Sequence, residues 1–180
     1  LSKAGPNDVV LLHGCCHNPT GADIDFAAWQ EITKLSIIKG FMPFVDIAYQ
    51  GFGDGLEEDA KGLRYMADNV EEMMITTSCS KNFGLYRERT GAAIVVGKNH
   101  VDVANAKGKL LTLARATYTM PPDHGAALVK TILQDDKLTQ VWKAELSSMQ
   151  QRLVALRHSL CEELRNVHAT AQFDFIESHK

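Results

Sequence analysis

The sequence lacks any long apolar run, and this absence limits where the protein can work. No stretch approaches the roughly 20 apolar residues that a membrane-spanning helix needs. The chain begins at Leu1 with neither a signal-peptide pattern nor an initiator Met. We therefore expect no membrane partner, and we expect the chain to be a fragment or a processed product.

Neither sign of charge predominates. Lys and Arg number 19 and Asp and Glu number 22, so the net charge is −3. This slightly acidic balance gives the protein no electrostatic reason to bind nucleic acid or an anionic lipid surface. Nucleic acid is therefore not an expected partner.

Cysteine is scarce as well, with four in 180 residues. Cys15, Cys16, Cys79 and Cys161 have neither the spacing of a disulfide framework nor that of paired CxxC metal motifs. Such usage is typical of a reducing compartment, and the cytoplasm is the expected location.

Several well-known nucleotide and nucleophile motifs are absent or incomplete. The sequence has no Walker A motif and no G-x-S-x-G elbow. The glycine-rich segment 51–55 lacks the third glycine of G-x-G-x-x-G, because Leu56 stands at that position. A nucleotide-binding oxidoreductase is therefore a weak alternative, which a nicotinamide titration would test.

The first hundred residues alternate between strand and helix patterns. Helical spacing predicts helices over 26–39, which Asp25 can cap and Gly40 can end, and over 57–69. The run 9–13 is apolar enough for a strand buried on both faces. Four strands are predicted in all, at 9–13, 41–46, 73–77 and 92–97. This alternation predicts an α/β fold with a mostly parallel sheet and flanking helices.

The chain turns helical after Gly97. A helix is predicted from about 100 to 114, and Pro121-Pro122 opens another. The longest helix is predicted over 138–167, because apolar residues recur there every three or four positions. Its apolar stripe consists of Trp142, Leu146, Met149, Leu153, Leu156 and Leu160. We divide the chain into a first unit (1–137), this linking helix (138–167) and the start of a second lobe (168–180).

Polar side chains follow the ends of the predicted strands, where open α/β sheets bind ligands. Their types match what pyridoxal phosphate (PLP) needs. The cofactor takes a lysine for a Schiff base, a carboxylate against its pyridine nitrogen, and donors for its phosphate and ring hydroxyl oxygen. The candidates are Asn18, Asp46, Tyr49, Ser78, Lys81 and Arg89.

Taken singly, each candidate also has an ordinary interpretation as a surface charge, a turn residue or a half-buried aromatic. A zinc site through His13, Cys15, Cys16 and His17 is one alternative, although adjacent ligands on a short turn seldom converge. A non-catalytic fragment or structural module is another.

The same residues lie in motifs that resemble those of the class I aspartate aminotransferases. The motifs occupy residues 13–21 (HGCCHNPTG), 46–52 (DIAYQGF), 78–91 (SCSKNFGLYRERTG) and 114–125 (ARATYTMPPDHG). Their order and spacing match over nearly the whole chain. Arg87 and Cys79 depart from the usual pattern, and both flank functional positions without replacing one.

The resemblance implies a role for each candidate. Lys81 would hold PLP and shuttle the substrate proton, Asp46 would pair with the pyridine nitrogen, and Tyr49 would assist catalysis from the ring hydroxyl oxygen. Asn18 would bond the same oxygen and border the substrate. The phosphate would be bound by Ser78 and Arg89. Arg115 would grip the distal carboxylate of the substrate in the neighbouring subunit's site.

The resemblance also implies a fold, a reaction and an assembly. Residues 1–137 would be part of the PLP-binding large domain of the fold type I transferases, truncated at both ends, and 168–180 would begin the small domain. The complete enzyme would be a homodimer that moves an amino group between aspartate and 2-oxoglutarate, giving oxaloacetate and glutamate. The 180 residues alone would be inactive or impaired, with weak PLP binding and exposed apolar surface.

Overall fold

The computed structural model, which describes residues 1–168 and 171–180, contains one four-stranded sheet in the order β1-β2-β3-β4. The strands are β1 (Val9–His13), β2 (Met42–Ile47), β3 (Met73–Ser78) and β4 (Gly91–Val96). The first three strands are parallel, and β4 is antiparallel to β3. The predicted α/β fold with a mostly parallel sheet is confirmed.

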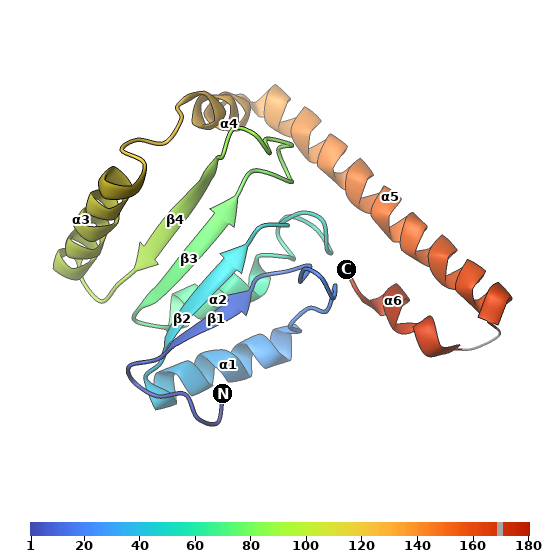
Figure 1. Ribbon diagram of the computed structural model, residues 1–180, viewed down its shortest axis with the longest axis horizontal. Helices are drawn as coiled ribbons and strands as arrows, with labels where there is room; N and C mark the ends of the chain where they lie inside the picture. Colours follow the sequence, from blue (N-terminus) through green and yellow to red (C-terminus); the bar gives the residue numbers. More distant parts are fainter. Residues whose placement is uncertain (169–170) are drawn as a thin grey trace.

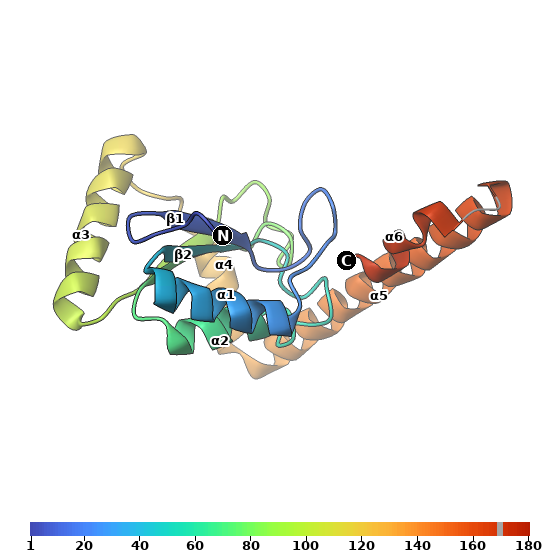
Figure 2. The same cartoon turned by 90° about the horizontal axis from the view of Figure 1, so that it is seen from below.

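Two helices, α1 (Phe26–Lys39) and α2 (Lys61–Asn69), lie side by side on one face of the sheet (Figure 2). As predicted, the carboxylate of Asp25 caps α1 by accepting a 2.7 Å hydrogen bond from Ala28 N. Gly40 ends the helix in the left-handed conformation (φ 74°), which glycine adopts without steric cost. The core beneath these helices is formed by Leu12, Cys15, Cys16, Trp29, Val45, Ile47, Leu63, Met66, Met73 and Ile75.

Close packing of α1 on α2 depends on the missing side chain of Gly62. A Cβ atom at Gly62 would overlap the indole of Trp29, which is only 3% exposed. We expect Gly62→Ala to lower the free energy of unfolding by about 1–3 kcal/mol, because the buried ring has to shift. Urea unfolding measures the change.

Gly108→Ala is the matched control, because a Cβ there meets no atom within 4 Å. Gly108 lies inside the exposed helix α3 (His100–Thr117), where alanine should raise stability by about 0.5–1 kcal/mol. If Gly62→Ala and Gly108→Ala changed the free energy of unfolding equally, contact with Trp29 would not be the cause of the change.

The opposite face of the sheet is largely uncovered by the described residues. Val9 and Leu11 in β1 are 54% and 67% exposed, so the expectation of a strand buried on both faces is wrong for this chain. Helix α3 has no buried residue either. The predicted exposure of apolar surface is thus observed at β1 and α3.

The rest of the chain forms an arm (Figure 1). Helix α4 (His124–Gln134) leads into α5 (Asp136–His168), which extends away from the sheet, and η1 (Ala171–Phe173) and α6 (Phe175–Ser178) return toward it. The long helix predicted at 138–167 is therefore present. Within the described residues, no helix combines the length and apolarity needed to cross a membrane.

The apolar stripe on α5 is covered at one end only. Leu146 is buried near the sheet, whereas Leu156 and Leu160 are 52% and 49% exposed farther along the helix. The proposed division into 1–137, 138–167 and 168–180 stays a prediction, and its last boundary touches residues 169–170, which lie outside the described residues.

Candidate active site

The carboxyl ends of β1, β2 and β3 meet at one edge of the sheet, and the loops that follow them enclose a cavity of about 650 Å³. Three predicted site residues, Asn18, Tyr49 and Lys81, line this cavity. Its opposite wall comes from Leu153 and Arg157 of α5 and from the C-terminal segment 175–180. The cavity therefore lies between the sheet and the arm.

Polar groups from three different loops contact one another in this cavity. The amide Nδ2 of Asn18 donates a 3.3 Å hydrogen bond to the hydroxyl oxygen of Tyr49. The Nζ atom of Lys81 lies 5.0 Å from the centroid of the Tyr49 ring, in a cation–π arrangement. An amine, a phenol and an amide thus lie close together, although Lys81 follows Asn18 by 63 positions in the sequence (81 − 18).

Asp46 lies within the sheet beside this group. It is opposite His13 of β1 and Thr76 of β3 in the strand register, and Thr76 Oγ1 donates a 2.9 Å hydrogen bond to its carboxylate. The His13 ring stacks on Tyr49 with 6.2 Å between centroids, and its buried Nδ1 has no hydrogen-bond partner among the described residues. The sequence did not predict that His13 and Thr76 lie beside Asp46. Knowledge of the strand register would have revealed both neighbours.

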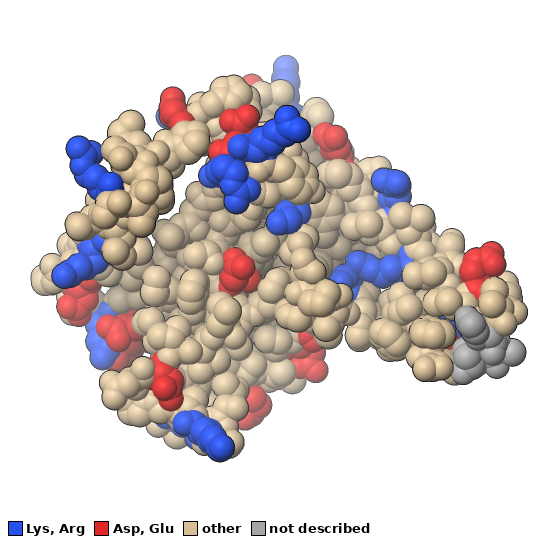
Figure 3. Space-filling view, viewed as in Figure 1, with Lys and Arg blue, Asp and Glu red and all other residues tan. Residues whose placement is uncertain are grey.

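The other predicted residues lie apart from the cavity wall as the structure describes it. Ser78 Oγ accepts a 3.1 Å hydrogen bond from Ser80 N in the turn before Lys81. Arg89 is exposed, has a φ of 50°, and donates to the Tyr86 carbonyl at 2.9 Å. Figure 3 shows Lys and Arg side chains gathered over the part of this face where the β3–β4 loop lies.

Arg115 lies in an element that does not border the cavity. It lies in the last turn of α3, beyond the edge strand β4, and its side chain is exposed. The structure therefore does not bring Arg115 to the cavity of its own chain.

A buried carboxylate organises the loop after Tyr49. Asp59, only 8% exposed, accepts hydrogen bonds from the backbone N–H groups of Gly51 (2.7 Å), Gly53 (3.0 Å) and Asp54 (2.7 Å). Because these amides already bind an anion, they are not available to cradle a phosphate. This geometry argues against the oxidoreductase alternative, and it was not predicted from the sequence.

The segment that carries Lys81 is anchored on both sides. Asn82 Nδ2 donates a hydrogen bond to the backbone carbonyl of Gln50 (3.2 Å). The backbone carbonyl of Asn82 accepts a hydrogen bond from Trp142 Nε1 of α5 (2.7 Å). The Phe83 and Trp142 rings stack with 4.3 Å between centroids and 10° between planes. The first turns of α5 therefore help to hold the position of Lys81.

The zinc alternative is not supported in the form that the sequence suggested. Among the described residues, the one cluster of metal-binding side chains joins Cys15 and Cys16 to Asp59, and it includes neither His13 nor His17. The pKa of the Cys15 thiol lies well above its usual range, because Cys16 shares a hydrogen bond with it, burial penalises its charged form, and Asp59 adds negative charge.

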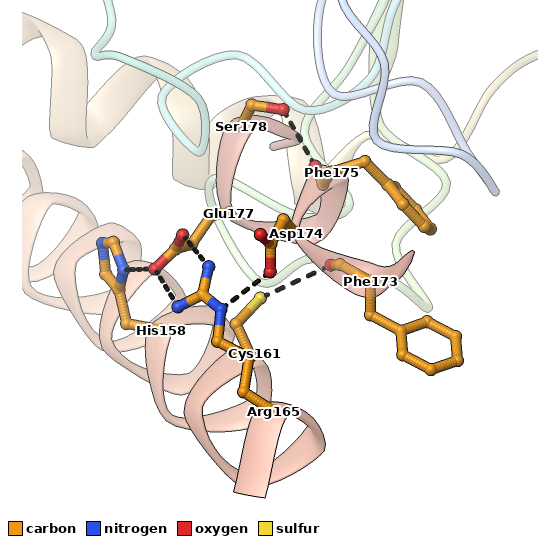
Figure 4. A network of polar contacts seen from close by, with 8 residues as sticks. All are labelled: His158, Cys161, Arg165, Phe173, Asp174, Phe175, Glu177 and Ser178. Atoms are coloured by element: carbon orange, nitrogen blue, oxygen red, sulfur yellow. Dashed lines mark hydrogen bonds and ion pairs between the residues drawn. The ribbon is translucent and has the colours of Figure 1, made fainter. Parts of the chain in front are cut away.

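Polar contacts hold the C-terminal segment against α5 (Figure 4). The Arg165 guanidinium donates to Asp174 and to Glu177 at 2.7 Å each, and His158 lies 3.2 Å from Glu177. Hydrogen bonding from Arg165 and then from His158 holds the pKa of Glu177 below its usual range. The segment ends at the cavity, where Lys180 N donates to the Gly21 carbonyl at 2.7 Å.

Comparison with known proteins gives consistent matches over the whole chain. The family model for aminotransferase class I and II matches residues 1–180. The chain is 45% identical over 180 residues to an aromatic-amino-acid aminotransferase of Paracoccus denitrificans. The aligned region covers 100% of this chain and 46% of that protein. It is 46% identical over 176 residues to an aspartate aminotransferase of Escherichia coli (strain K12), covering 98% and 44%.

A solved structure also matches nearly the whole chain. An aromatic-amino-acid aminotransferase from Burkholderia pseudomallei, covalently bound to pyridoxal phosphate, superposes with a TM-score of 0.94 at 36% identity, covering 98% of this chain and 44% of that one. The chain thus spans less than half the length of the relatives that it matches.

Proposed function

Because the chain belongs to the class I and II aminotransferases, we propose that the whole protein transfers amino groups between amino acids and 2-oxo acids with PLP as its cofactor. The single observation that carries this proposal is the meeting of Lys81, Tyr49 and Asn18 in one cavity at the carboxyl edge of the sheet. A primary amine among hydrogen-bonding groups is what a carbonyl cofactor needs.

The residues in the cavity and beside it fit PLP by their chemistry. Lys81 supplies the amine, Asp46 supplies a half-buried carboxylate oriented by Thr76, and the phenol of Tyr49 and the amide of Asn18 supply polar groups for the ring oxygen. When bound, PLP supplies an electron sink that stabilises negative charge on the substrate carbon. The protein then has to fix the ring and move the proton.

Lys81 is the residue placed to move that proton. Its amine would hold the cofactor and, once displaced by the amine of the substrate, would take the proton from the substrate Cα and deliver it to the cofactor carbon. The hydrogen bonds that join Asn82 to Gln50 and to Trp142 restrict the backbone directly after Lys81. Restricting the amine in this way lowers the entropic cost of positioning it for the reaction.

We assign the phosphate of PLP to Ser78 and Arg89. Ser78 ends β3 three residues before Lys81, and Arg89 follows on the same loop. An arginine fork and a hydroxyl are suitable donors for a phosphate. Arg89 is exposed, and its guanidinium has five N–H donors, so its hydrogen bond to the Tyr86 carbonyl leaves donors for a bound anion.

For the substrate we propose aspartate and other dicarboxylic amino acids, with Asn18 at the substrate's edge and Arg115 as the grip on the distal carboxylate. Since Arg115 lies outside its own chain's cavity, it would reach the site of a second copy in a homodimer. The named relatives include both aspartate and aromatic-amino-acid aminotransferases, so substrate preference is the point to test.

Arg115→Ala should lower kcat/KM of the whole protein for aspartate by about 10²-fold or more, because the carboxylate loses its charged partner. Phenylalanine carries no distal carboxylate, so its kcat/KM should change little. Steady-state assays with both substrates give the ratio. Lys107→Ala on the same helix is the control. If Arg115→Ala lowered kcat/KM equally for aspartate and phenylalanine, Arg115 would have no role in recognising the distal carboxylate.

We also infer a cytoplasmic location and a second domain that begins near residue 168. The four cysteines are all free, which fits a reducing compartment. The uncovered stripe at Leu156 and Leu160 fits a helix that links two lobes.

A further inference from the structure

Two adjacent thiols and a carboxylate converge beneath the β1 loop. Cys15, Cys16 and Asp59 each offer one donor atom, and the three atoms lie within 4.8 Å of one another. Their residues are 3%, 8% and 8% exposed, respectively. We propose that Cys15, Cys16 and Asp59 form a binding site for a thiophilic divalent cation of the zinc class.

The backbone explains how consecutive thiols come together. In an extended chain, neighbouring side chains point to opposite sides. Cys16 instead has a φ of 51°, in the left-handed region, which breaks this alternation directly after β1. Both sulfur atoms therefore come to the side of Asp59, which arrives from the segment before α2.

The carboxylate of Asp59 is already fixed in orientation. Its Oδ2 accepts from Gly51 N and Gly53 N, and its Oδ1 accepts from Asp54 N. A carboxylate has about four acceptor positions, so one remains for a cation. Hydrogen bonds of this kind to a ligand orient it and raise metal affinity.

An acidic cavity gives a cation access to the cluster. Cys15 and Asp59 line a second cavity of about 550 Å³, whose wall does not include Lys81. Two lysines, Lys61 and Lys180, share its wall with five carboxylates, so cations are attracted. The carboxylates are those of Asp23, Asp25, Asp54, Glu58 and Asp59.

The donor set selects the class of ion. Zinc takes sulfur at about 2.3 Å and carboxylate oxygen at about 2.0–2.2 Å, so a tetrahedral ion needs its ligands slightly closer together than the 4.8 Å limit found here. On binding, each thiol gives its proton to solvent, and water completes the coordination. Magnesium and calcium prefer all-oxygen sites and should bind at least tenfold more weakly.

A cadmium titration of the purified, PLP-free protein tests the site, because two thiolates on one ion give sulfur-to-metal absorption in the ultraviolet. We expect one equivalent to saturate the signal, and we expect Cys15→Ser and Cys16→Ser each to weaken binding by about 10²-fold or more. Cys161→Ser, which removes a buried thiol on α5, should leave binding unchanged. Equal affinity in all three variants would overturn the proposal.

A second measurement needs no variant. Zinc should slow alkylation of Cys15 and Cys16 by iodoacetamide in the unsubstituted protein, read for each cysteine by peptide mass spectrometry. Cys79 and Cys161 should react as before, and magnesium should protect none of the four. If zinc leaves the rates at Cys15 and Cys16 unchanged, the site does not exist. Neither test uses PLP, so their failure would leave the proposed transaminase untouched.

Discussion

Lys81→Ala is expected to abolish covalent retention of PLP and to lower transaminase turnover of the whole protein by at least about 10⁴-fold, as removal of a catalytic group typically does. The reason is that Lys81 lines the cavity with its amine beside the Tyr49 ring. Intact-mass spectrometry after borohydride reduction measures the retained cofactor.

A second lysine provides the matched control. Lys180 borders the same cavity, but its amine is paired with the carboxylate of Asp54. Lys180→Ala should therefore keep the covalent cofactor. Full retention in Lys81→Ala together with loss in Lys180→Ala would move the attachment point to Lys180 and end the assignment.

Asp46→Asn should lower turnover on the order of 10²- to 10³-fold while PLP stays attached to Lys81. A carboxylate at this position favours a proton on the facing pyridine nitrogen, and an amide of the same size carries no charge to do so. Stopped-flow loss of the substrate Cα proton measures the effect separately from product release.

Thr76→Val separates the charge of Asp46 from its orientation. It removes only the 2.9 Å hydrogen bond to the carboxylate, and the expected loss is up to about tenfold. If Asp46→Asn retained full turnover, or if Thr76→Val were equally damaging, charge at Asp46 would not be the source of the effect.

The fold could be predicted from the sequence where local signals and tertiary packing agree. Asp25 and Gly40 mark the ends of α1 by their own chemistry, and the apolar runs mark the strands. The sequence pattern predicts the start of the second helix at residue 57, whereas α2 begins at Lys61, because Asp59 binds the loop amides and so keeps the preceding residues in turns. The hydrogen bonds of Asp59 to Gly51 and Gly53 join residues that no sequence motif links.

The candidate site could be predicted in part for a topological reason. Parallel strands present their carboxyl ends at one edge, so Asn18, Tyr49 and Lys81 had to come close once the strands were recognised. The lateral neighbours of Asp46 depend on strand register, which the sequence does not encode locally. Arg115 lies outside the cavity of its own chain, so its proposed role would require a second subunit.

A crystal structure of the protein grown with excess PLP tests the central claim most directly. The expected map shows continuous density from Lys81 Nζ to the cofactor, with the pyridine nitrogen within hydrogen-bond distance of the Asp46 carboxylate. Cofactor bound elsewhere, with the Lys81 amine in open solvent, would contradict the assignment.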